Sequence, residues 1–246
     1  MTANEGLAAA VGTTDQVLIE ELSMLEGAME RNYAWAYEII APFLGRSLLE
    51  VGSGVGVMSR YLVDRGDPVV LSDHHPAYLS YLRDRFGARA NVTLQILDLD
   101  HPPYVVDRSI DTIVCLNVLE HMADDAAVLA AFARLLPDRG RLVLQVPNYP
   151  ALFGSLDESY GHFRRYTRRT LTARLQEAGF HIVALRNFNP LAIPGWIVSA
   201  KLLRSRRVGV RSARLFNALV PIARRMDFLS TFAGLALIVC AERRDA

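Results

Sequence analysis

The segment from Leu48 to Gly56 constrains the fold of this chain more than any other part of the sequence. Its letters, LLEVGSGVG, run from an apolar stretch through one acidic residue into three alternating glycines, and VMSRYL follows with helical spacing. This order is typical of a strand, a tight turn and the start of a helix, where a nucleotide-like ligand can approach bare backbone. Glycine suits such a turn because it adopts positive φ angles and places no Cβ between chain and ligand.

The spacing of the three glycines distinguishes two kinds of ligand. A dinucleotide fingerprint, G-x-G-x-x-G, would place the third glycine at position 57, where this chain has Val57. The third glycine instead comes one residue earlier, as Gly56, and Glu50 lies two residues before the first glycine. This pattern resembles motif I of the class I S-adenosylmethionine-dependent methyltransferases. It argues against a nicotinamide-dependent oxidoreductase, the alternative enzyme class.

Three later strand-like segments end in polar residues at positions that also resemble this family. Segment 67–73 is apolar and ends at Asp73, whose carboxylate could accept both ribose hydroxyls of a nucleotide. Segment 91–100 alternates like a strand, and in the family an acid at the position of Asp98 receives the adenine amino group. Segment 109–121 ends in NVLEH and resembles the family's fourth motif, whose strand tip lies beside the methionine part of the cofactor.

The resemblance implies S-adenosylmethionine as the cofactor, and in the family an acid at the position of Glu50 orients the glycine loop or the methionine amino group. A carboxylate that only accepts hydrogen bonds from backbone amides at the turn would occupy nearly the same place. The residues expected to contact the cofactor are Glu50, Gly52, Ser53, Gly54, Gly56, Asp73, His74, Asp98, Leu99, Asn117 and Val118.

Strand patterns alternate with helical patterns from residue 48 to residue 146, which predicts an α/β fold with a doubly wound, mostly parallel sheet. The resemblance implies seven strands in the order 3-2-1-4-5-7-6, with the seventh antiparallel. Ligand sites in such sheets lie at the carboxyl ends of the strands, where the strand order reverses. We expect the strands near 47–51, 68–72, 92–97, 110–116, 141–146, 181–186 and 235–241.

The whole chain, 1–246, is expected to form a single methyltransferase domain. Two apolar stripes predict N-terminal helices within 15–45, the first capped by Asp15, and Thr167 is the expected cap of a later helix. Residues 187–231, called the cap below, connect the last two strands. A connection of this length usually carries helices of its own or a function, so we expect a helical cap.

Two histidines are candidates for a general base. His121, the first candidate, lies where the fourth strand gives way to a helix, near the expected methyl group. His162, the second, lies in the segment that follows the fifth strand. A base is needed only when the acceptor holds its proton, because positioning otherwise supplies most of the rate. His121 could instead be a helix-start histidine that bonds only to backbone.

The NVLEH string also resembles the ubiquinone-pathway O-methyltransferases. In those enzymes a Glu-x-x-Glu-His pattern is linked to a divalent metal, but here Asn117 stands in place of the first Glu. We therefore expect no metal ion at this site.

The segment 157–167, DESYGHFRRYT, collects histidine, tyrosine and arginine in a loop that we expect to pass over the catalytic mouth. Loops on rigid scaffolds often carry function, and a similar string recurs in a bacterial branch of the family. The arginines could alternatively anchor the loop to Asp157 or Glu158. The residues expected to contact the acceptor are Tyr33, Tyr160, Arg164, Arg165, Tyr166 and Trp196.

The cap is basic and amphipathic. No acidic residue occurs between Glu177 and Asp227. Such a cap could lie on anionic lipid or bind an acidic substrate, or it could simply cover a core with its charges solvated. One helical face is expected to hold Leu215, Phe216, Leu219, Ile222, Ala223 and Met226. The cations of the cap are Lys201, Arg204, Arg206, Arg207, Arg211, Arg214, Arg224 and Arg225.

Composition limits the remaining classes. The net charge of +1 gives no whole-molecule argument for nucleic acid, and we find no aromatic and basic platform for it. No apolar run reaches the length of about 18 residues that spans a membrane, and the first residues do not resemble a secretion signal. Cys115 and Cys240 lie in apolar strands and are expected to be buried thiols. We expect a cytoplasmic protein, with peripheral contact to an anionic membrane left open.

Together these features predict an S-adenosylmethionine-dependent methyltransferase that methylates a small or amphipathic acceptor, with oxygen as the favoured atom. A non-catalytic protein that binds the cofactor, or that lies on a membrane, is the alternative from another class. The intact glycines and strand-end acids favour the enzyme. The sequence identifies neither the acceptor nor the oligomeric state.

Overall fold

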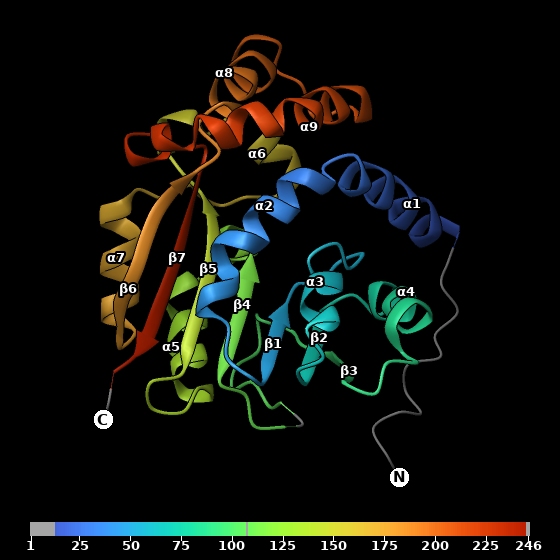
Figure 1. Ribbon diagram of the computed structural model, residues 1–246, viewed down its shortest axis with the longest axis vertical. Coiled ribbons are helices and arrows are strands. Elements are labelled where there is room, and N and C mark those ends of the chain that lie inside the picture. Colours follow the sequence, from blue (N-terminus) through green and yellow to red (C-terminus); the bar gives the residue numbers. More distant parts are fainter. Residues whose placement is uncertain (1–12, 107, 245–246) are drawn as a thin grey trace.

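A seven-stranded sheet in the order β3-β2-β1-β4-β5-β7-β6 forms the centre of the computed structural model, which describes residues 13–106 and 108–244 (Figure 1). Strand β7 runs antiparallel to both β5 and β6, and the other pairs are parallel. The predicted order and the antiparallel seventh strand are confirmed. The strands are β1 (Leu48–Val51), β2 (Val69–Asp73), β3 (Val92–Ile96), β4 (Thr112–Leu116), β5 (Arg141–Pro147), β6 (Phe180–Phe188) and β7 (Ala236–Arg243).

Helices connect and cover these strands. The α-helices are α1 (Thr13–Gly27), α2 (Glu30–Ile40), α3 (Ser59–Asp64), α4 (Pro76–Phe86), α5 (Asp125–Leu135), α6 (Ser155–Tyr160), α7 (Arg168–Glu177), α8 (Ala192–Trp196) and α9 (Val210–Arg225). Shorter segments are η1 (Ala41–Phe43), η2 (Leu119–His121), η3 (Pro150–Leu152), the π-helical η4 (Ile197–Leu202) and η5 (Asp227–Thr231).

The structure tests the two predicted N-terminal capping residues of helices. Thr167 caps α7 as expected, because its Oγ1 atom accepts a hydrogen bond from the backbone N of Thr170 at 3.1 Å. The prediction that Asp15 is the N-terminal capping residue of α1 is wrong, because Asp15 lies inside this helix, which the structure describes from Thr13.

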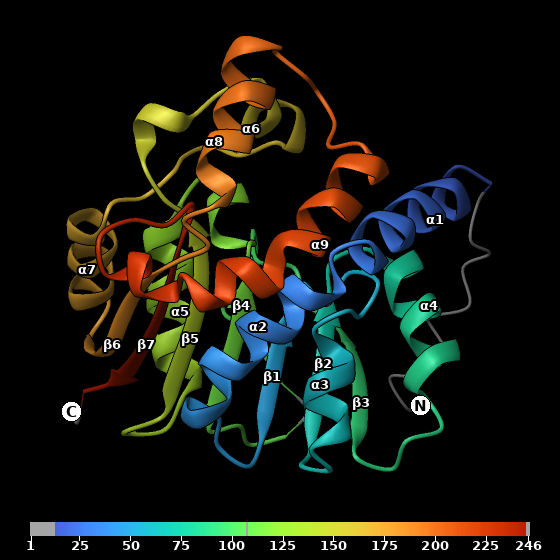
Figure 2. The same ribbon diagram turned by 45° about the horizontal axis from the view of Figure 1, so that its top comes forward.

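The two faces of the sheet bury different sets of residues because neighbouring strand residues point to opposite sides. Leu49 of β1 packs in one apolar cluster with Phe132 of α5 and Leu171 of α7. Leu48 packs in another cluster with Ile40 of α2 and Leu79 of α4. In Figure 2, α2 and α3 lie in front of the strands and α5 lies behind them. With both faces covered, a ligand reaches the sheet only at the strand ends.

The cap contains α8, η4, α9 and η5. It lies at the end of the molecule toward which the parallel strands point (Figure 1). Within it, Val220 and Ala223 of α9 join the apolar cluster that includes α2. The chain enters and leaves this region at one place, where the backbone N of Leu235 donates to the backbone O of Asn189 at 3.3 Å.

Two further expectations, about the cysteines and about membrane-spanning helices, can be compared with the structure. Cys115 and Cys240 are both buried, and burial raises the pKa of each thiol. Among the described residues, no helix is both long and apolar enough to cross a membrane.

Candidate active site

The glycine loop after β1 has the backbone that its sequence predicts. The φ angles of Gly52, Gly54 and Gly56 are +70°, +53° and +78°. A Cβ on Gly52 would lie 2.4 Å from Cγ2 of Val118, and one on Gly56 would lie 2.7 Å from Cδ2 of Leu82. A Cβ on Gly54 would meet nothing closer than 4.0 Å. Two of the glycines therefore allow close packing, and the middle one leaves open space above the loop.

Glu50 stabilises the glycine loop through hydrogen bonds. Its side chain is buried, and its Oε2 atom accepts hydrogen bonds from the Oγ atoms of Ser53, at 2.8 Å, and of Ser59. Burial raises the pKa of Glu50 to about 7, and the two serine bonds oppose that rise. The partners shown are serine hydroxyls and not backbone amides, which agrees with a carboxyl group that orients the glycine loop.

Asp73, the last residue of β2, connects its strand to the glycine loop. Its Oδ2 atom accepts from the backbone N of Gly54 at 2.9 Å, and its Oδ1 atom accepts from the backbone N of His75 at 3.0 Å. The exposed ring of His74 lies beside it, with Nδ1 3.2 Å from Oδ1. The structure therefore brings the predicted residues Gly54, Asp73 and His74 together.

Asp98 follows β3 and is half exposed. Its carboxylate accepts from the backbone N of Asp100 at 2.9 Å and lies 2.8 Å from Nδ1 of His101. These hydrogen bonds, the backbone one first, lower the pKa of Asp98. The adjacent Leu99 is buried. Asp73 ends β2 and Asp98 follows β3, so both lie at the carboxyl ends of neighbouring strands, as their positions in the sequence predict.

Asn117 and Val118 form the turn after β4. Asn117 has a φ of +55°, and its Oδ1 atom accepts from Nε2 of Gln145 on β5 at 3.1 Å. Val118 is the residue that a side chain at Gly52 would strike. The ends of β1 and β4 therefore meet, which is where the strand order of the sheet reverses.

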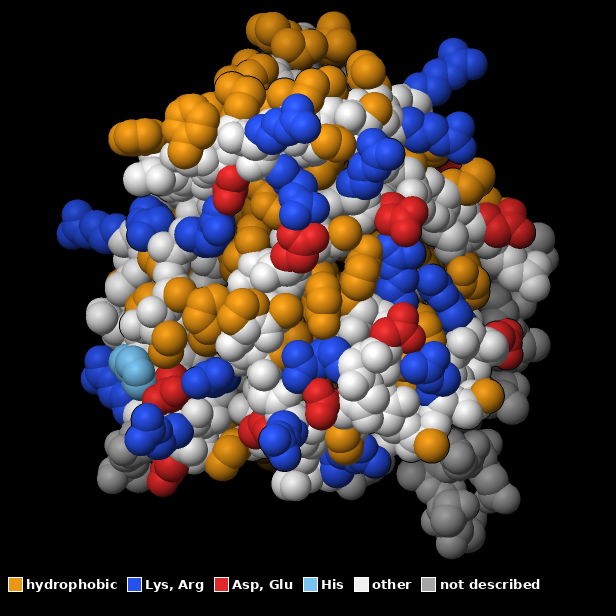
Figure 3. All heavy atoms as spheres, viewed as in Figure 1, with side chains coloured by type: hydrophobic (Ala, Val, Ile, Leu, Met, Phe, Trp, Pro, Cys, Tyr) orange, Lys and Arg blue, Asp and Glu red, His pale blue; other side chains and the backbone are white. Residues whose placement is uncertain are grey.

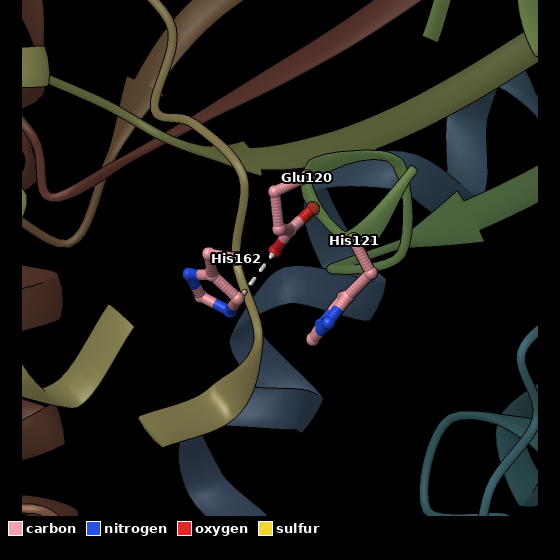
Figure 4. A group of neighbouring side chains, drawn as sticks. All are labelled: Glu120, His121 and His162. Carbon is pink, nitrogen blue, oxygen red and sulfur yellow. Dashed lines mark ion pairs between the residues drawn. The ribbon is translucent and has the colours of Figure 1, made fainter. Parts of the chain in front are cut away.

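A cluster of three titratable side chains lies beside this turn. Figure 4 shows Glu120 and His121 of η2 facing His162, which comes from the loop between α6 and α7. The Nε2 atom of His162 lies 4.0 Å from Oε1 of Glu120, and the rings of His121 and His162 meet edge to face with centroids 4.7 Å apart. On its other side, Nδ1 of His162 lies 2.9 Å from Oδ1 of Asp157. The structure brings both predicted base candidates together.

The protonation of this cluster is set by its surroundings. Burial raises the pKa of Glu120 to about 8, so its carboxyl is largely neutral at neutral pH. Partial burial, followed by His162 and His74, lowers the pKa of His121 to about 4, so that ring is neutral as well. Burial acts against the charge of Asp157, but hydrogen bonds and charge from His162 and Arg165 lower its pKa overall.

Sequence reasoning missed Glu120 and gave Asp157 only an anchoring role. Both are buried carboxyl groups that face His162. The one available signal for Glu120 was its place beside His121 in the NVLEH string. Atoms of Glu120, His121 and His162 that could bind a metal lie within 4.8 Å of one another. Asn117, which stands where the ubiquinone-pathway pattern has its first Glu, is absent from this group.

Arg165 and Trp196 anchor the loop that contains His162 through contacts within the protein. Arg165 is buried, with Nε 2.8 Å from Oδ1 of Asp157 and Nη1 3.0 Å from the backbone O of Asn148. Its guanidinium lies 4.3 Å from the ring centroid of Trp196, whose Nε1 donates to the backbone O of Leu152 at 3.1 Å. The anchoring interpretation therefore applies to Arg165, and we withdraw both residues from the acceptor contacts.

Arg164 and Tyr166 are also satisfied within the protein. Arg164 pairs with Asp125 of α5 at 2.9 Å and donates to the backbone O of Ala123 at 2.6 Å. Tyr166 is buried, and its hydroxyl donates to Oδ2 of Asp125 at 2.9 Å. Because their polar groups already have partners at α5, we withdraw these two residues from the acceptor contacts as well.

Tyr33 and Tyr160 stay as predicted acceptor contacts. Tyr33 of α2 is half-buried beside two apolar clusters, and the Tyr160 hydroxyl accepts from the backbone N of Val208 at 3.1 Å. A groove of about 540 Å³ between α2, β6, β7 and α9 is lined by none of the predicted site residues. The candidate site therefore rests on the strand ends and not on that groove.

The curated proteins to which this chain is similar are methyltransferases. The family described as "Methyltransferase domain" matches residues 26–185. A "probable S-adenosylmethionine-dependent methyltransferase" of Mycobacterium tuberculosis is 27% identical over 164 residues, which cover 65% of this chain and 58% of that protein. The ubiquinone biosynthesis O-methyltransferase of Pseudomonas aeruginosa is 26% identical over 167 residues, which cover 61% of this chain and 72% of that protein.

Solved structures agree on the fold. An S-adenosylmethionine-dependent methyltransferase from Mesorhizobium loti superposes with a TM-score of 0.61 at 16% identity, over 84% of this chain and 97% of that chain. At this identity the likeness shows the fold alone. The chain spans about three fifths of the length of the first curated relatives that it matches.

Proposed function

Because the chain belongs to the class I S-adenosylmethionine-dependent methyltransferases, we propose that it transfers a methyl group to the oxygen of a small or amphipathic acceptor. The single observation that carries the choice of oxygen is the partly buried contact between His162 and Asp157. A hydroxyl group holds its proton at neutral pH and becomes a good nucleophile when a base removes that proton.

The glycine loop and the strand-end acids fit the cofactor. Gly54 leaves open space where a ligand can approach backbone, and acceptor oxygens follow β2 and β3 at Asp73 and Asp98. We assign Asp73 to the ribose hydroxyls and Asp98 to the adenine amino group. The remaining proposed contacts come from Gly52, Ser53, Gly56, His74, Leu99, Asn117 and Val118, with Glu50 orienting the loop. S-adenosylmethionine supplies an already activated methyl group on its sulfonium.

His162 is the proposed base. Asp157 accepts a hydrogen bond from Nδ1 of His162, which fixes the tautomer and leaves the lone pair on Nε2. That Nε2 atom would take the hydroxyl proton of the acceptor, and the charged Asp157 would stabilise the imidazolium that forms. His121 is neutral, but its lowered pKa of about 4 makes it a weak base. The geometry therefore favours His162 over His121, which reverses the order given by the sequence.

The acceptor class is supported by the relatives and by the surface of the cap. The name of the Pseudomonas aeruginosa relative refers to ubiquinone biosynthesis, which favours an amphipathic acceptor. Such a molecule partitions into membranes, so the proposal includes peripheral contact of a cytoplasmic protein with an anionic membrane. Tyr33 and Tyr160 are the proposed acceptor contacts.

Methyl-labelled S-adenosylmethionine tests the proposal. The purified protein is incubated with a set of alkyl-substituted phenols and the matching alkyl anilines, and products are identified by mass spectrometry. We expect labelled methyl ethers from at least one phenol and no labelled amine. Labelled amines without ethers, or the failure of S-adenosylmethionine to bind in calorimetry, would contradict the proposal.

A further inference from the structure

The outer surface of the cap exposes large apolar side chains. On α9, Leu215, Leu219 and Ile222 are spaced by four and three residues and form one stripe that faces solvent, with exposures of 66%, 45% and 51%. Figure 3 shows hydrophobic side chains gathered at the top of this view, where Figure 1 has α8 and α9, with Lys and Arg side chains close by. Further exposed members are Ile197, Val198, Leu202, Leu203, Phe228 and Phe232.

This arrangement corrects the expected single apolar face of α9. Ala223 is buried and Phe216 packs against the apolar cluster that includes α2, while Leu215, Leu219 and Ile222 face outward. The apolar stripe is therefore not used to cover the core. Exposed apolar patches of this kind mark interaction sites on soluble proteins.

Between Trp196 and Asp227 every charged side chain of the cap is a cation. Two of the eight cations of the cap form ion pairs with acids of α1 and α2. Arg207 lies 3.4 Å from Glu21, and Arg224 pairs with Glu38. Acids from outside the cap therefore oppose part of its charge. Five exposed arginines of the cap form no ion pair with any acid whose side chain the structure describes: Arg204, Arg206, Arg211, Arg214 and Arg225.

We infer that this surface, formed by η4, α9 and η5, docks the protein on an anionic lipid bilayer. The apolar stripe would enter the boundary between headgroups and acyl chains, and the unpaired arginines would contact lipid phosphates. A second copy of the chain fits less well. A two-fold contact would bring the same arginines of both copies close together, and like charges repel.

The docking surface is connected directly to the loop that carries His162. The Oγ atom of Ser155, in α6, donates to the backbone O of Ala200 at 3.0 Å and to that of Ser205 at 2.7 Å. The hydroxyl of Tyr160 accepts from Val208 N. A bilayer bound at the cap would therefore lie next to the segment proposed to contact the acceptor. The inference rests on the proposed function, because it assigns the proposed membrane contact to one surface.

Vesicle flotation with the full chain tests the inference. Wild-type protein is mixed with vesicles of phosphatidylcholine alone, or of phosphatidylcholine with phosphatidylglycerol. We expect binding only to the mixed vesicles, weakened by high salt because salt screens exposed charges. The charge variant Arg206→Glu/Arg211→Glu/Arg214→Glu avoids the paired Arg207. Both it and Leu202→Ser/Leu203→Ser/Leu215→Ser should bind more than tenfold more weakly.

Control variants place three Arg→Glu changes, or two apolar→Ser changes, outside the cap. Arg46→Glu/Arg108→Glu/Arg169→Glu and Val105→Ser/Val183→Ser should bind vesicles like wild type. Unchanged S-adenosylmethionine affinity in calorimetry shows that a variant is folded, and turnover of a water-soluble acceptor without vesicles tests the proposed function separately. The inference is overturned if wild type does not float with anionic vesicles, or if both cap variants float as wild type does. It is also overturned if sedimentation velocity shows a dimer that the leucine variant dissociates while vesicle binding stays unchanged.

Discussion

His162 and the buried Asp157 form a pair in which Nδ1 of the histidine lies 2.9 Å from Oδ1 of the carboxylate. Asp157 lies in the first turn of α6, and His162 lies just beyond the end of this helix. The pair therefore depends on a short and well-anchored piece of chain. Arg165 bonds to the same carboxylate oxygen and keeps it charged.

Removing the proposed base should slow the chemistry and leave cofactor binding intact. We expect His162→Ala to lower turnover of a hydroxyl acceptor by about 10²–10⁴, and His121→Ala to lower it less. The control is His181→Ala on β6, which lies outside the site and should turn over normally. Steady-state kinetics and calorimetry measure the two effects. Normal turnover by both site variants at every pH would show that neither histidine acts as the base.

The buried carboxyl of Glu120 should make stability fall as the pH rises. Its folded pKa of about 8 lies above the value of 4.5 expected in the unfolded chain, so the folded state binds more protons between those values. Its contribution is fully present below about pH 4.5 and is lost as the pH rises through about 8. Glu50, with a folded pKa of about 7, acts in the same direction.

The measurement is the free energy of unfolding from urea denaturation between about pH 5 and about pH 8. We expect Glu120→Gln to reduce the downward slope by up to about 1.4 kcal/mol per pH unit. The exposed Glu158→Gln should keep the wild-type slope. Equal slopes in all three proteins would show that Glu120 ionises normally in the fold.

Asp73 should contribute to cofactor affinity. Replacement by Ala removes charge-assisted hydrogen bonds worth about 1.5–3 kcal/mol each, so calorimetry should show a large loss of S-adenosylmethionine affinity. Asp73→Asn keeps an acceptor oxygen for the loop contact with Gly54 and separates folding from binding. The exposed Asp84→Asn serves as the control. Unchanged affinity in both Asp73 variants would remove this residue from the site.

Gly52 offers a test of close packing at the switch in strand order. Gly52→Ala and Gly66→Ala both place a side chain at a positive φ, which costs about 1–2 kcal/mol. Only the first also strikes Val118, while the Cβ at Gly66 meets nothing within 4 Å. We expect Gly52→Ala to lose more stability and to bind the cofactor at least tenfold more weakly. Val118→Ala in the same chain should restore part of both, and no restoration would mean that the two residues act independently.

Chelation tests the expectation that no metal takes part. Asn117 stands where the ubiquinone-pathway pattern has its first Glu, and its Oδ1 atom already accepts from Gln145. We expect turnover to be unchanged after dialysis against EDTA, and added magnesium or zinc to have no stimulating effect. Loss of activity with EDTA and its recovery with one cation would contradict this expectation.

The geometry of the glycine loop and the placement of the strand-end acids could be predicted because their signals are local. Glycine spacing at Gly52, Gly54 and Gly56 reports a backbone conformation, and the strand-end acids are found by counting along alternating segments. Parallel strands then bring Asp73 and Asp98 to one edge whatever the details of packing.

Contacts between distant segments could not be predicted in this way. Arg164 and Tyr166 both bond to Asp125, about forty residues earlier in the chain, and no periodicity reveals such a partner. The outward stripe of α9 was missed for a related reason. A repeat of apolar residues predicts a helix with an apolar side, but neighbours such as α2 decide which side is covered.

The antiparallel pairing of β6 with β7 has a consequence for how this protein can change. The chain departs toward the cap at Asn189 and returns at Leu235, and the backbones of these two residues are hydrogen-bonded to each other. Since doubling the length of a loop adds only about 0.6 kcal/mol of closure entropy, the stretch between them can be exchanged as a cassette. The proposed acceptor and membrane contacts can then change through this one junction while the glycine loop keeps its geometry.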